Sequence, residues 1–226
     1  MTKTAKRVET RSYNSPRRRE QAAATRRRIL EAAQRLFERQ GYAATSVAAI
    51  AAEAGVALKT VYVVFETKSE ILRELWNLLL RGDIEEIPVA ERKWYREVLE
   101  EPDPERQLRL NARNSRRAKG RIAALIEVIR TAAPAEPEIE ALWKRIESDF
   151  HENQGRIAKS LQKKGALRSG LSVRRATDIL WTLNHPDVYQ LLVGRRGWTP
   201  AQYEKWLGDA FCSEVLGPST SRKRSA

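Results

Sequence analysis

The chain has 226 residues, of which 42% are hydrophobic and 31% are charged, a balance typical of a globular protein with one large or two small domains. No apolar run approaches the roughly 20 residues that a membrane-spanning helix needs, and the basic N-terminus lacks the apolar stretch of a secretory signal. The single cysteine, Cys212, excludes an internal disulfide and a metal site built from several thiolates. We therefore expect a cytoplasmic protein.

The formal net charge of +13 is concentrated at the two ends of the chain. The first 35 residues hold +8 and the last ten hold +3, so only +2 of the total remains for residues 36–216. Lysine and arginine beside phosphates release condensed counterions, which gives salt-dependent affinity for DNA of any base sequence; a solubilising role is the alternative. We expect residues 1–20 to be a disordered basic arm and residues 217–226 to be a basic tail.

The first predicted helix runs from about Ala22 to Gln40, because its apolar residues recur at helical spacing and a glycine follows it. It opens a domain predicted for residues 21–68. Within that domain, residues 45–64 have the pattern of a helix-turn-helix, in which two short helices meet at a sharp turn.

Residue types at the turn support the helix-turn-helix prediction. Thr45 or Ser46 is placed to cap the first of its helices. Gly55 can adopt the positive φ that a sharp turn between helices requires. The second helix, from about Leu58 to Phe65, is short enough to lie in a DNA major groove.

Proline and glycine divide the remaining region, residues 69–216, into further predicted helices. A fourth helix starts at Thr67 or Ser69 and continues to Gly82. The later helices are expected at Pro88 to Leu99, Pro104 to Arg117 with a break near Gly120, Ile122 to Ile129, Pro137 to Lys164, Ser172 to Leu183, Pro186 to Val193 and Thr199 to Leu216. The pattern contains no convincing strands or repeats. It predicts an all-α protein with an N-terminal three-helix helix-turn-helix domain followed by a larger helical bundle.

Residues 26–75, RRRILEAAQRLFERQGYAATSVAAIAAEAGVALKTVYVVFETKSEILREL, resemble the DNA-binding domain of the TetR (tetracycline repressor) family of bacterial transcriptional regulators. The matching positions are Phe37, Gly41, Tyr42, Thr45, Ile50, Ala51, Ala54, Gly55, Val56, Thr60, Val61, Tyr62, Phe65, Lys68 and Leu72. The resemblance implies a homodimeric repressor that binds double-stranded DNA at a palindromic operator. It also implies that an unidentified small-molecule effector, bound in the C-terminal domain, releases the protein from DNA.

The expected DNA contacts follow from this resemblance and from side-chain chemistry. Tyr62 and Lys68 resemble phosphate-contacting residues of the family. Val63, where the family often has an aromatic residue or histidine, can pack on a thymine methyl group, while Thr60 and Lys59 supply polar readout. The full expected set is Arg27, Tyr42, Thr45, Ser46, Leu58, Lys59, Thr60, Tyr62, Val63 and Lys68.

Several of these positions keep a structural alternative. Tyr42 suits a core aromatic as well as a phosphate contact, and Thr45 suits a helix cap alone. Each arginine from Arg26 to Arg28 either grips a backbone phosphate, reaches the minor groove or is simply solvated, and Lys68 is either a phosphate contact or a solvated surface charge. Val64 is expected to be a core residue.

The C-terminal region offers candidate ligand residues rather than a defined site. Six tryptophans are many for this length, and buried indoles either line an apolar cavity or pack in a core. The expected ligand contacts are Trp76, Trp94, Asn111, Ile126, Trp143, His151 and Trp181. Glu147 and His151 form an i, i+4 pair that lacks further metal ligands, and no catalytic constellation is visible. We expect no metal, no cofactor and no enzymatic activity.

The last helices are rich in large apolar residues, which the resemblance places in a dimer contact. The expected dimer residues are Leu180, Leu191, Tyr203, Trp206 and Phe211. A palindromic operator is read by two recognition helices about one DNA turn apart, which requires a two-fold partner. The alternative is that these faces complete the core of the monomer. The alternative function is an architectural or nucleoid-type protein that coats DNA without an effector.

Overall fold

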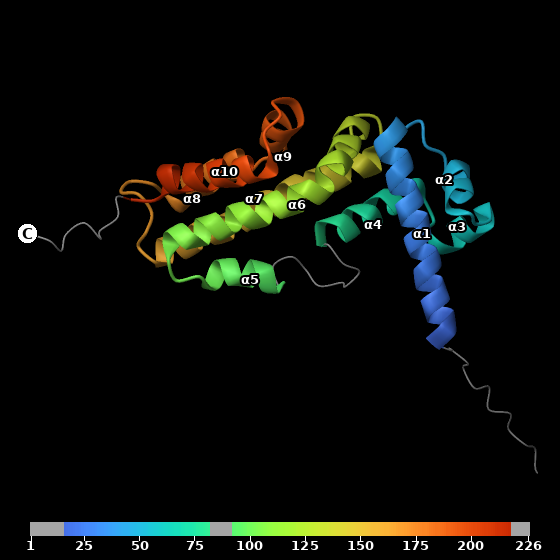
Figure 1. Ribbon diagram of the computed structural model, residues 1–226, viewed down its shortest axis with the longest axis horizontal. Coiled ribbons are helices and arrows are strands. Elements are labelled where there is room, and N and C mark those ends of the chain that lie inside the picture. Colours follow the sequence, from blue (N-terminus) through green and yellow to red (C-terminus); the bar gives the residue numbers. More distant parts are fainter. Residues whose placement is uncertain (1–15, 82–91, 218–226) are drawn as a thin grey trace, which may run out of the picture.

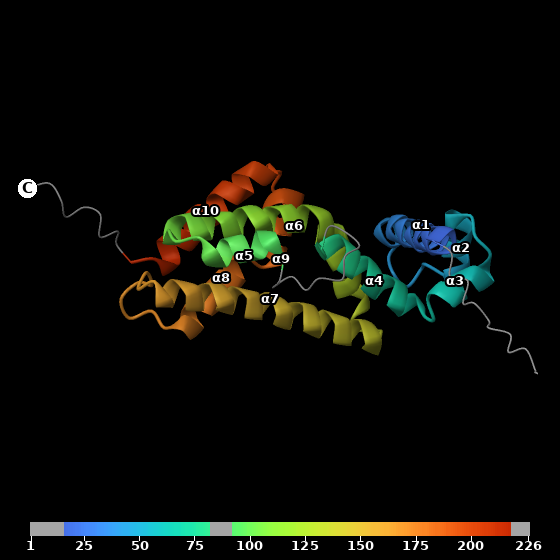
Figure 2. The same cartoon turned by 90° about the horizontal axis from the view of Figure 1, so that it is seen from below.

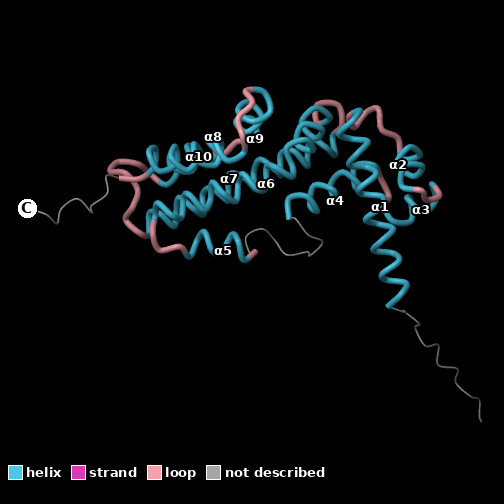
Figure 3. The backbone as a smooth tube through the Cα atoms, in the orientation of Figure 1, coloured by secondary structure: helices cyan, strands magenta, loops and turns pink. Residues whose placement is uncertain are grey.

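The computed structural model describes residues 16–81 and 92–217, and every regular element within these ranges is a helix (Figure 3). An isolated antiparallel bridge joins Leu167 and Leu216. The elements are α1 (Pro16–Gln40), α2 (Val47–Ala54), α3 (Leu58–Val64), α4 (Lys68–Arg81), α5 (Lys93–Glu100), α6 (Pro104–Ala132), α7 (Pro137–Lys163), α8 (Val173–Leu183), α9 (Pro186–Tyr189), the π-helix η2 (Gln190–Arg195) and α10 (Pro200–Val215). The all-α prediction is confirmed.

Within residues 16–81 and 92–217, no single helix is long and apolar enough to cross a membrane. Helices α2 and α3 reach the length and apolar composition of a membrane span only when they are taken together, and a bend of 104° separates them.

Helices α1, α2 and α3 lie together at one end of the molecule (Figure 1). They form a three-helix domain because each has one apolar face, and Phe37, Ile50 and Val61 from these faces are fully buried. The helix-turn-helix therefore rests on α1, and this arrangement fixes the direction in which α3 faces solvent.

Helix α1 begins at Pro16 rather than near Ala22, and proline suits the first turn of a helix because that turn has no use for its missing N–H. The disorder expected for residues 1–20 is therefore wrong from Pro16 onward. Residues 1–15 and the expected tail after Gly217 lie outside the described residues.

Helix α4 connects this domain to the bundle through a continuous hydrophobic core. The core runs from Ile29 on α1 through Leu72 on α4 to Leu125 on α6 and Ile146 on α7. All four side chains are almost completely buried. The helix-turn-helix domain and the near ends of α6 and α7 thus form one packed unit, and α4 lies between them (Figure 2).

The bundle is built around the two long helices α6 and α7, which run along the molecule in both views (Figures 1 and 2). Helix α10 packs mainly on α6, and α8 packs mainly on α7. A second core between them contains Leu108, Ile157, Leu180, Tyr203 and Phe211.

The break predicted near Gly120 is wrong, because α6 continues through that residue. A glycine inside a helix is only about 1 kcal/mol less favourable than alanine. Ile122 and Leu125, one turn further on, are fully buried, and burial of each stabilises the helix by about 1.5–3 kcal/mol. The helix start expected at Pro88 lies outside the described residues, and α5 begins at Lys93.

The later helix boundaries follow the sequence closely. The Ser172 side chain caps α8, and Thr199 forms a capping box with Gln202 at the start of α10. The helix predicted from Pro186 to Val193 is instead the short α9 followed by η2.

Candidate nucleic-acid interface and cavity

The turn between α2 and α3 has the geometry of a helix-turn-helix. Ser46 caps α2, and its hydroxyl accepts a hydrogen bond from the N–H of Ala49 at 3.1 Å. Gly55 ends the helix with φ 63° and ψ 40°, a left-handed conformation that favours glycine. The two helices meet at 104°, within the usual range for this motif.

Two arginines of α1 donate hydrogen bonds to carbonyl groups at the C-terminal ends of α2 and α3. Nη2 of Arg28 donates to the carbonyl oxygens of Ala54 at 2.6 Å and Gly55 at 3.0 Å. A cation at this end of a helix satisfies free carbonyls and opposes the negative end of the helix dipole. The Arg28 side chain therefore has a structural role, which none of the alternatives drawn from the sequence included.

Arg26 makes the corresponding link to α3 and α4. Its Nη1 donates to the carbonyl of Val64 at 3.4 Å, and its Nη2 lies 3.1 Å from a carboxylate oxygen of Glu74. The guanidinium carbon also lies 4.6 Å from the centre of the Phe65 ring. By contrast, Arg27, the arginine expected at DNA, is exposed and pairs with Glu31 in the next turn.

Helix α3 exposes an unusual amount of apolar surface. The exposed fractions are 76% for Val63, 52% for Tyr62 and 42% for Leu58, and Lys59 beside them is also exposed. Thr60 is half-buried. Clustered large apolar side chains in contact with water typically mark a binding surface.

The opposite face of α3 is the side that packs on the domain. Val61 is completely buried, and Val64 is partly buried against the first core. This confirms the core position predicted for Val64. The helix therefore turns one face inward and leaves the predicted base-reading face in solvent.

The start of α4 is bonded to the chain that follows α1. Nζ of Lys68 donates to the carbonyls of Tyr42 and Thr45, both at 3.0 Å, and lies 4.0 Å from the centre of the Tyr42 ring. Burial lowers the pKa of Lys68, and burial together with Glu136 and Glu138 raises the pKa of Tyr42 to about 12. The lysine thus joins α4 to the helix-turn-helix, whatever it contacts outside the protein.

Thr45 is almost completely buried, and its hydroxyl donates to the carbonyl of Gly41 at 2.8 Å. Ser46, not Thr45, caps α2. Of the two residues expected to cap this helix, Ser46 is the cap and remains exposed, whereas the Thr45 hydroxyl is buried and does not face a phosphate. Tyr42 is likewise buried and stacks on Phe37 with ring centres 5.6 Å apart.

The bundle contains a cavity of about 600 Å³ between α4, α5, α6 and α7. Three of the expected ligand residues line it: Trp76, Trp94 and Asn111. The Asn111 amide donates to the side-chain oxygen of Gln154 at 3.0 Å, which joins α6 to α7 beside the cavity.

Four expected ligand residues do not line this cavity. Ile126 belongs to the first core, and Trp143 is partly buried against it. His151 contacts Asp178 at 3.0 Å and lies edge-on to Trp181. The tryptophan count indicated an aromatic-rich bundle, but not which indoles surround the same space.

Sequence reasoning missed Lys119, which also lines the cavity. Leu108, Ala112, Lys119 and Ile122 lie at helical spacing and are all buried on α6. The predicted break near Gly120 hid this stripe, because it ended the helix one residue after the lysine.

The expected dimer residues divide into two groups. Leu180, Tyr203 and Phe211 are completely buried in the monomer, so their assignment to an exposed dimer surface is wrong. Leu191 is 50% exposed and Trp206 is half-buried.

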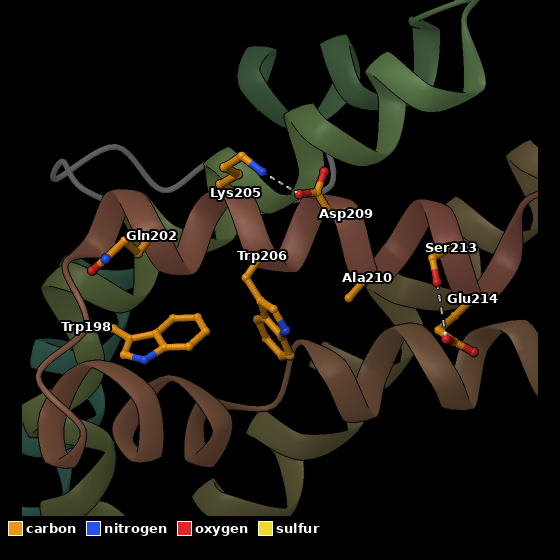
Figure 4. Close-up of a pocket in the computed structure, with 8 residues that line it drawn as sticks. All are labelled: Trp198, Gln202, Lys205, Trp206, Asp209, Ala210, Ser213 and Glu214. Atoms are coloured by element: carbon orange, nitrogen blue, oxygen red, sulfur yellow. Dashed lines mark hydrogen bonds and ion pairs between the residues drawn. The ribbon is translucent and has the colours of Figure 1, made fainter.

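Trp206 lines a hollow on the outer face of α10 (Figure 4). Its ring centre lies 6.1 Å from that of Trp198 in an edge-to-face arrangement. Lys205 and Asp209 pair at 2.9 Å on the other side of the helix. These two indoles form an apolar patch bordered by charge.

These features define an all-α helix-turn-helix protein whose helical bundle contains a cavity. Residues 29–75 match the family described as bacterial regulatory proteins, tetR family. The HTH-type transcriptional regulator AcrR of Shigella flexneri is 42% identical over 59 residues, which cover 26% of this chain and 27% of that protein. The chain therefore aligns with about a quarter of that relative's length.

The similarity in fold extends over almost the whole chain. A protein from Saccharomonospora viridis in complex with choline has a TM-score of 0.67 at 22% identity, covering 87% of this chain and all of that one. SmeT in complex with triclosan has a TM-score of 0.66 at 18% identity, covering 90% of this chain and 99% of that one. SmeT is the repressor of a multidrug efflux pump of Stenotrophomonas maltophilia. Residues 29–75 are thus similar to the tetR family, in agreement with the resemblance seen in the sequence.

Proposed function

We propose that this protein is a sequence-specific DNA-binding transcriptional repressor that a small-molecule effector releases from its operator. The exposed face of α3, which presents Leu58, Lys59, Tyr62 and Val63 beyond a rigid turn, is the observation that carries this proposal. A seven-residue helix held in this way fits a major groove, which admits an α-helix. The net charge of +8 on the first 35 residues adds attraction to phosphates.

Readout is assigned by the chemistry of the exposed side chains. Val63 packs on a thymine methyl group because it has no hydrogen-bonding atom, whereas Lys59 and Thr60 supply polar contacts to base edges. Tyr62 donates its hydroxyl to a backbone phosphate, which positions the helix without reading sequence.

Dimerisation supplies the second recognition helix. Two copies related by a two-fold axis match a palindromic site whose half-sites lie about 34 Å apart. With three of the expected residues buried in the monomer, Leu191 and Trp206 are the ones that remain available for this contact.

Effector release is proposed to pass through α4. This helix borders the cavity through Trp76 and contacts α1 through the Glu74–Arg26 pair. Arg26 in turn donates to the last residue of α3. An effector that binds more tightly to a shifted α4 would change the spacing of the two recognition helices, because only a difference in affinity between two states can move the equilibrium. Choline and triclosan in the similar structures support small organic molecules as effectors of this fold.

Selection of bound duplexes from a random DNA pool, at about 0.15 M salt, tests the proposal. We expect enrichment of one near-palindrome, and weaker binding with the same preference in Tyr62→Ala, because the Tyr62 hydroxyl contacts a phosphate. Binding to all duplexes alike would support the architectural alternative and refute a repressor.

The Val63 assignment has its own test. Replacing the contacted thymine with uracil removes only the methyl group, so affinity should fall for the natural protein. The Val63→Ala variant should bind the thymine-containing and the uracil-containing duplex with similar affinity. Equal affinity of the natural protein for both bases would refute this contact.

A further inference from the structure

The cavity between α4 and α7 has aromatic walls suited to a flat apolar molecule. Trp76 from α4, Trp94 from α5 and Phe150 from α7 all line it, together with Ile122 from α6. The Trp76 and Phe150 rings meet edge to face with centres 6.3 Å apart. Aromatic ligands gain from such walls through offset and edge contacts in addition to burial of apolar area.

One wall residue, Lys119, is a deeply buried lysine. It is 3% exposed, and its Nζ donates to the hydroxyl of Tyr203 at 2.8 Å and to the side-chain oxygen of Asn184, which also lines the cavity. Both acceptors are neutral. Burial lowers the pKa of Lys119 well below its ordinary value, because a charge without a counter-charge is unfavourable in a protein interior.

The other cations of the cavity differ from Lys119 because they have acidic partners. Arg156 lies 2.8 Å from Glu152, and Arg145 lies 3.9 Å from Asp149. These carboxylates are more than half exposed. Within residues 16–81 and 92–217, no carboxylate lies within 4.0 Å of the Lys119 amine. Arg145 and Arg156 thus lie beside acidic partners, whereas the Lys119 amine has only the neutral partners Tyr203 and Asn184 among the described residues.

We infer that the cavity takes an aromatic carboxylate, with its ring system between Trp76, Trp94 and Phe150 and its carboxylate on Lys119. The inference names the chemical class of the effector in the proposed function and rests on that function only for its biological role. A carboxylate supplies the missing counter-charge. It can also accept a hydrogen bond from the third N–H of the ammonium group, since Tyr203 and Asn184 accept from the other two N–H groups. The amide side chain of Asn184 lies at the same end and offers a further hydrogen-bond donor.

Three probes with the same ring system but different head groups test this assignment. The probes are 2-naphthoate, 2-naphthalenemethanol and 2-naphthylmethylammonium, titrated by calorimetry into the full chain without DNA. We expect 2-naphthoate to bind at least about tenfold more tightly than the alcohol, because hydrogen bonds to charged groups are worth more than neutral ones. The ammonium probe should bind most weakly.

Two lysine variants separate the buried amine from general charge. Lys119→Met should weaken 2-naphthoate binding about tenfold or more and leave the alcohol nearly unchanged, since methionine keeps the length and apolar stem. Lys159→Met is the matched control, because Lys159 is an exposed residue of α7 outside the cavity. It should bind all three probes like the natural protein.

The inference is overturned if the alcohol or the ammonium probe binds as tightly as 2-naphthoate, if Lys119→Met binds 2-naphthoate normally, or if no probe binds. The probe comparison needs only the natural protein, so it stands even where a variant folds poorly. Because DNA is absent, these results are independent of the duplex selection. A protein that prefers 2-naphthoate but no duplex sequence would refute the repressor and retain the carboxylate site.

Discussion

Gly55→Ala tests whether the turn of the helix-turn-helix depends on both its backbone conformation and its arginine cap. Gly55 has φ 63°, and a residue with a Cβ in the left-handed region costs about 1–2 kcal/mol. The added Cβ would lie 3.2 Å from Nη2 of Arg28, so the guanidinium must shift by a few tenths of an ångström, which weakens its bonds to the carbonyls at the end of α2. Loss of a cation at a helix C-terminus costs about 0.3–1 kcal/mol more.

Gly165→Ala is the matched control, because Gly165 follows α7 with φ 64° and its added Cβ would meet no atom within 4 Å. Urea denaturation followed by far-ultraviolet circular dichroism should show a larger loss of unfolding free energy for Gly55→Ala. In an Arg28→Met background the two alanine substitutions should cost the same. Equal losses in the natural background would refute the role of Arg28.

Three further outcomes are expected. Ser46→Ala should lower the unfolding free energy by about 1 kcal/mol through loss of the α2 cap, and Ser46→Asp should not; equal losses in urea denaturation would contradict the cap. Lys119→Met should be more stable than the natural protein at neutral pH, and this advantage should shrink as the pH rises towards 10.5, the ordinary value from which burial lowers the lysine pKa. The unfolded chain binds the Lys119 proton more tightly than the folded chain, so the natural protein gains stability as the pH rises towards 10.5. A stability advantage of Lys119→Met that does not change with pH would refute this reasoning. Tyr62→Phe should weaken binding to every duplex by about twofold to tenfold, the value of one hydrogen bond, in fluorescence anisotropy titrations; a loss confined to one sequence would instead indicate base readout.

The helix-turn-helix could be predicted because local rules determine it. Ser46 as a cap, Gly55 in the left-handed region and a buried Val61 each follow from the preferences of a few neighbouring residues. The break near Gly120 was wrong for the opposite reason. Packing on both sides of α6 outweighs the weak local preference of one glycine.

The partners of an apolar face could not be read from the sequence. The spacing of Leu180, Tyr203 and Phe211 indicates buried helix faces, but the same spacing suits a second copy and the chain's own α6 equally well. In this protein α10 packs on α6, which buries Tyr203 and Phe211 within the monomer. Lys119 was missed because a lysine between apolar positions is ordinarily a solvated charge.

The packing that joins Ile29, Leu72, Leu125 and Ile146 limits where this chain can be divided or recombined with another protein. A fragment that ends after α3 would lack α4 and the region between α6 and α7. Apolar side chains of α1 would then be exposed to water. Such a fragment should aggregate rather than bind operators. A hybrid that joins α1, α2 and α3 to the sensor domain of another protein must therefore also include α4 and the region between α6 and α7. The boundary for recombination lies inside the bundle and not at the end of α3.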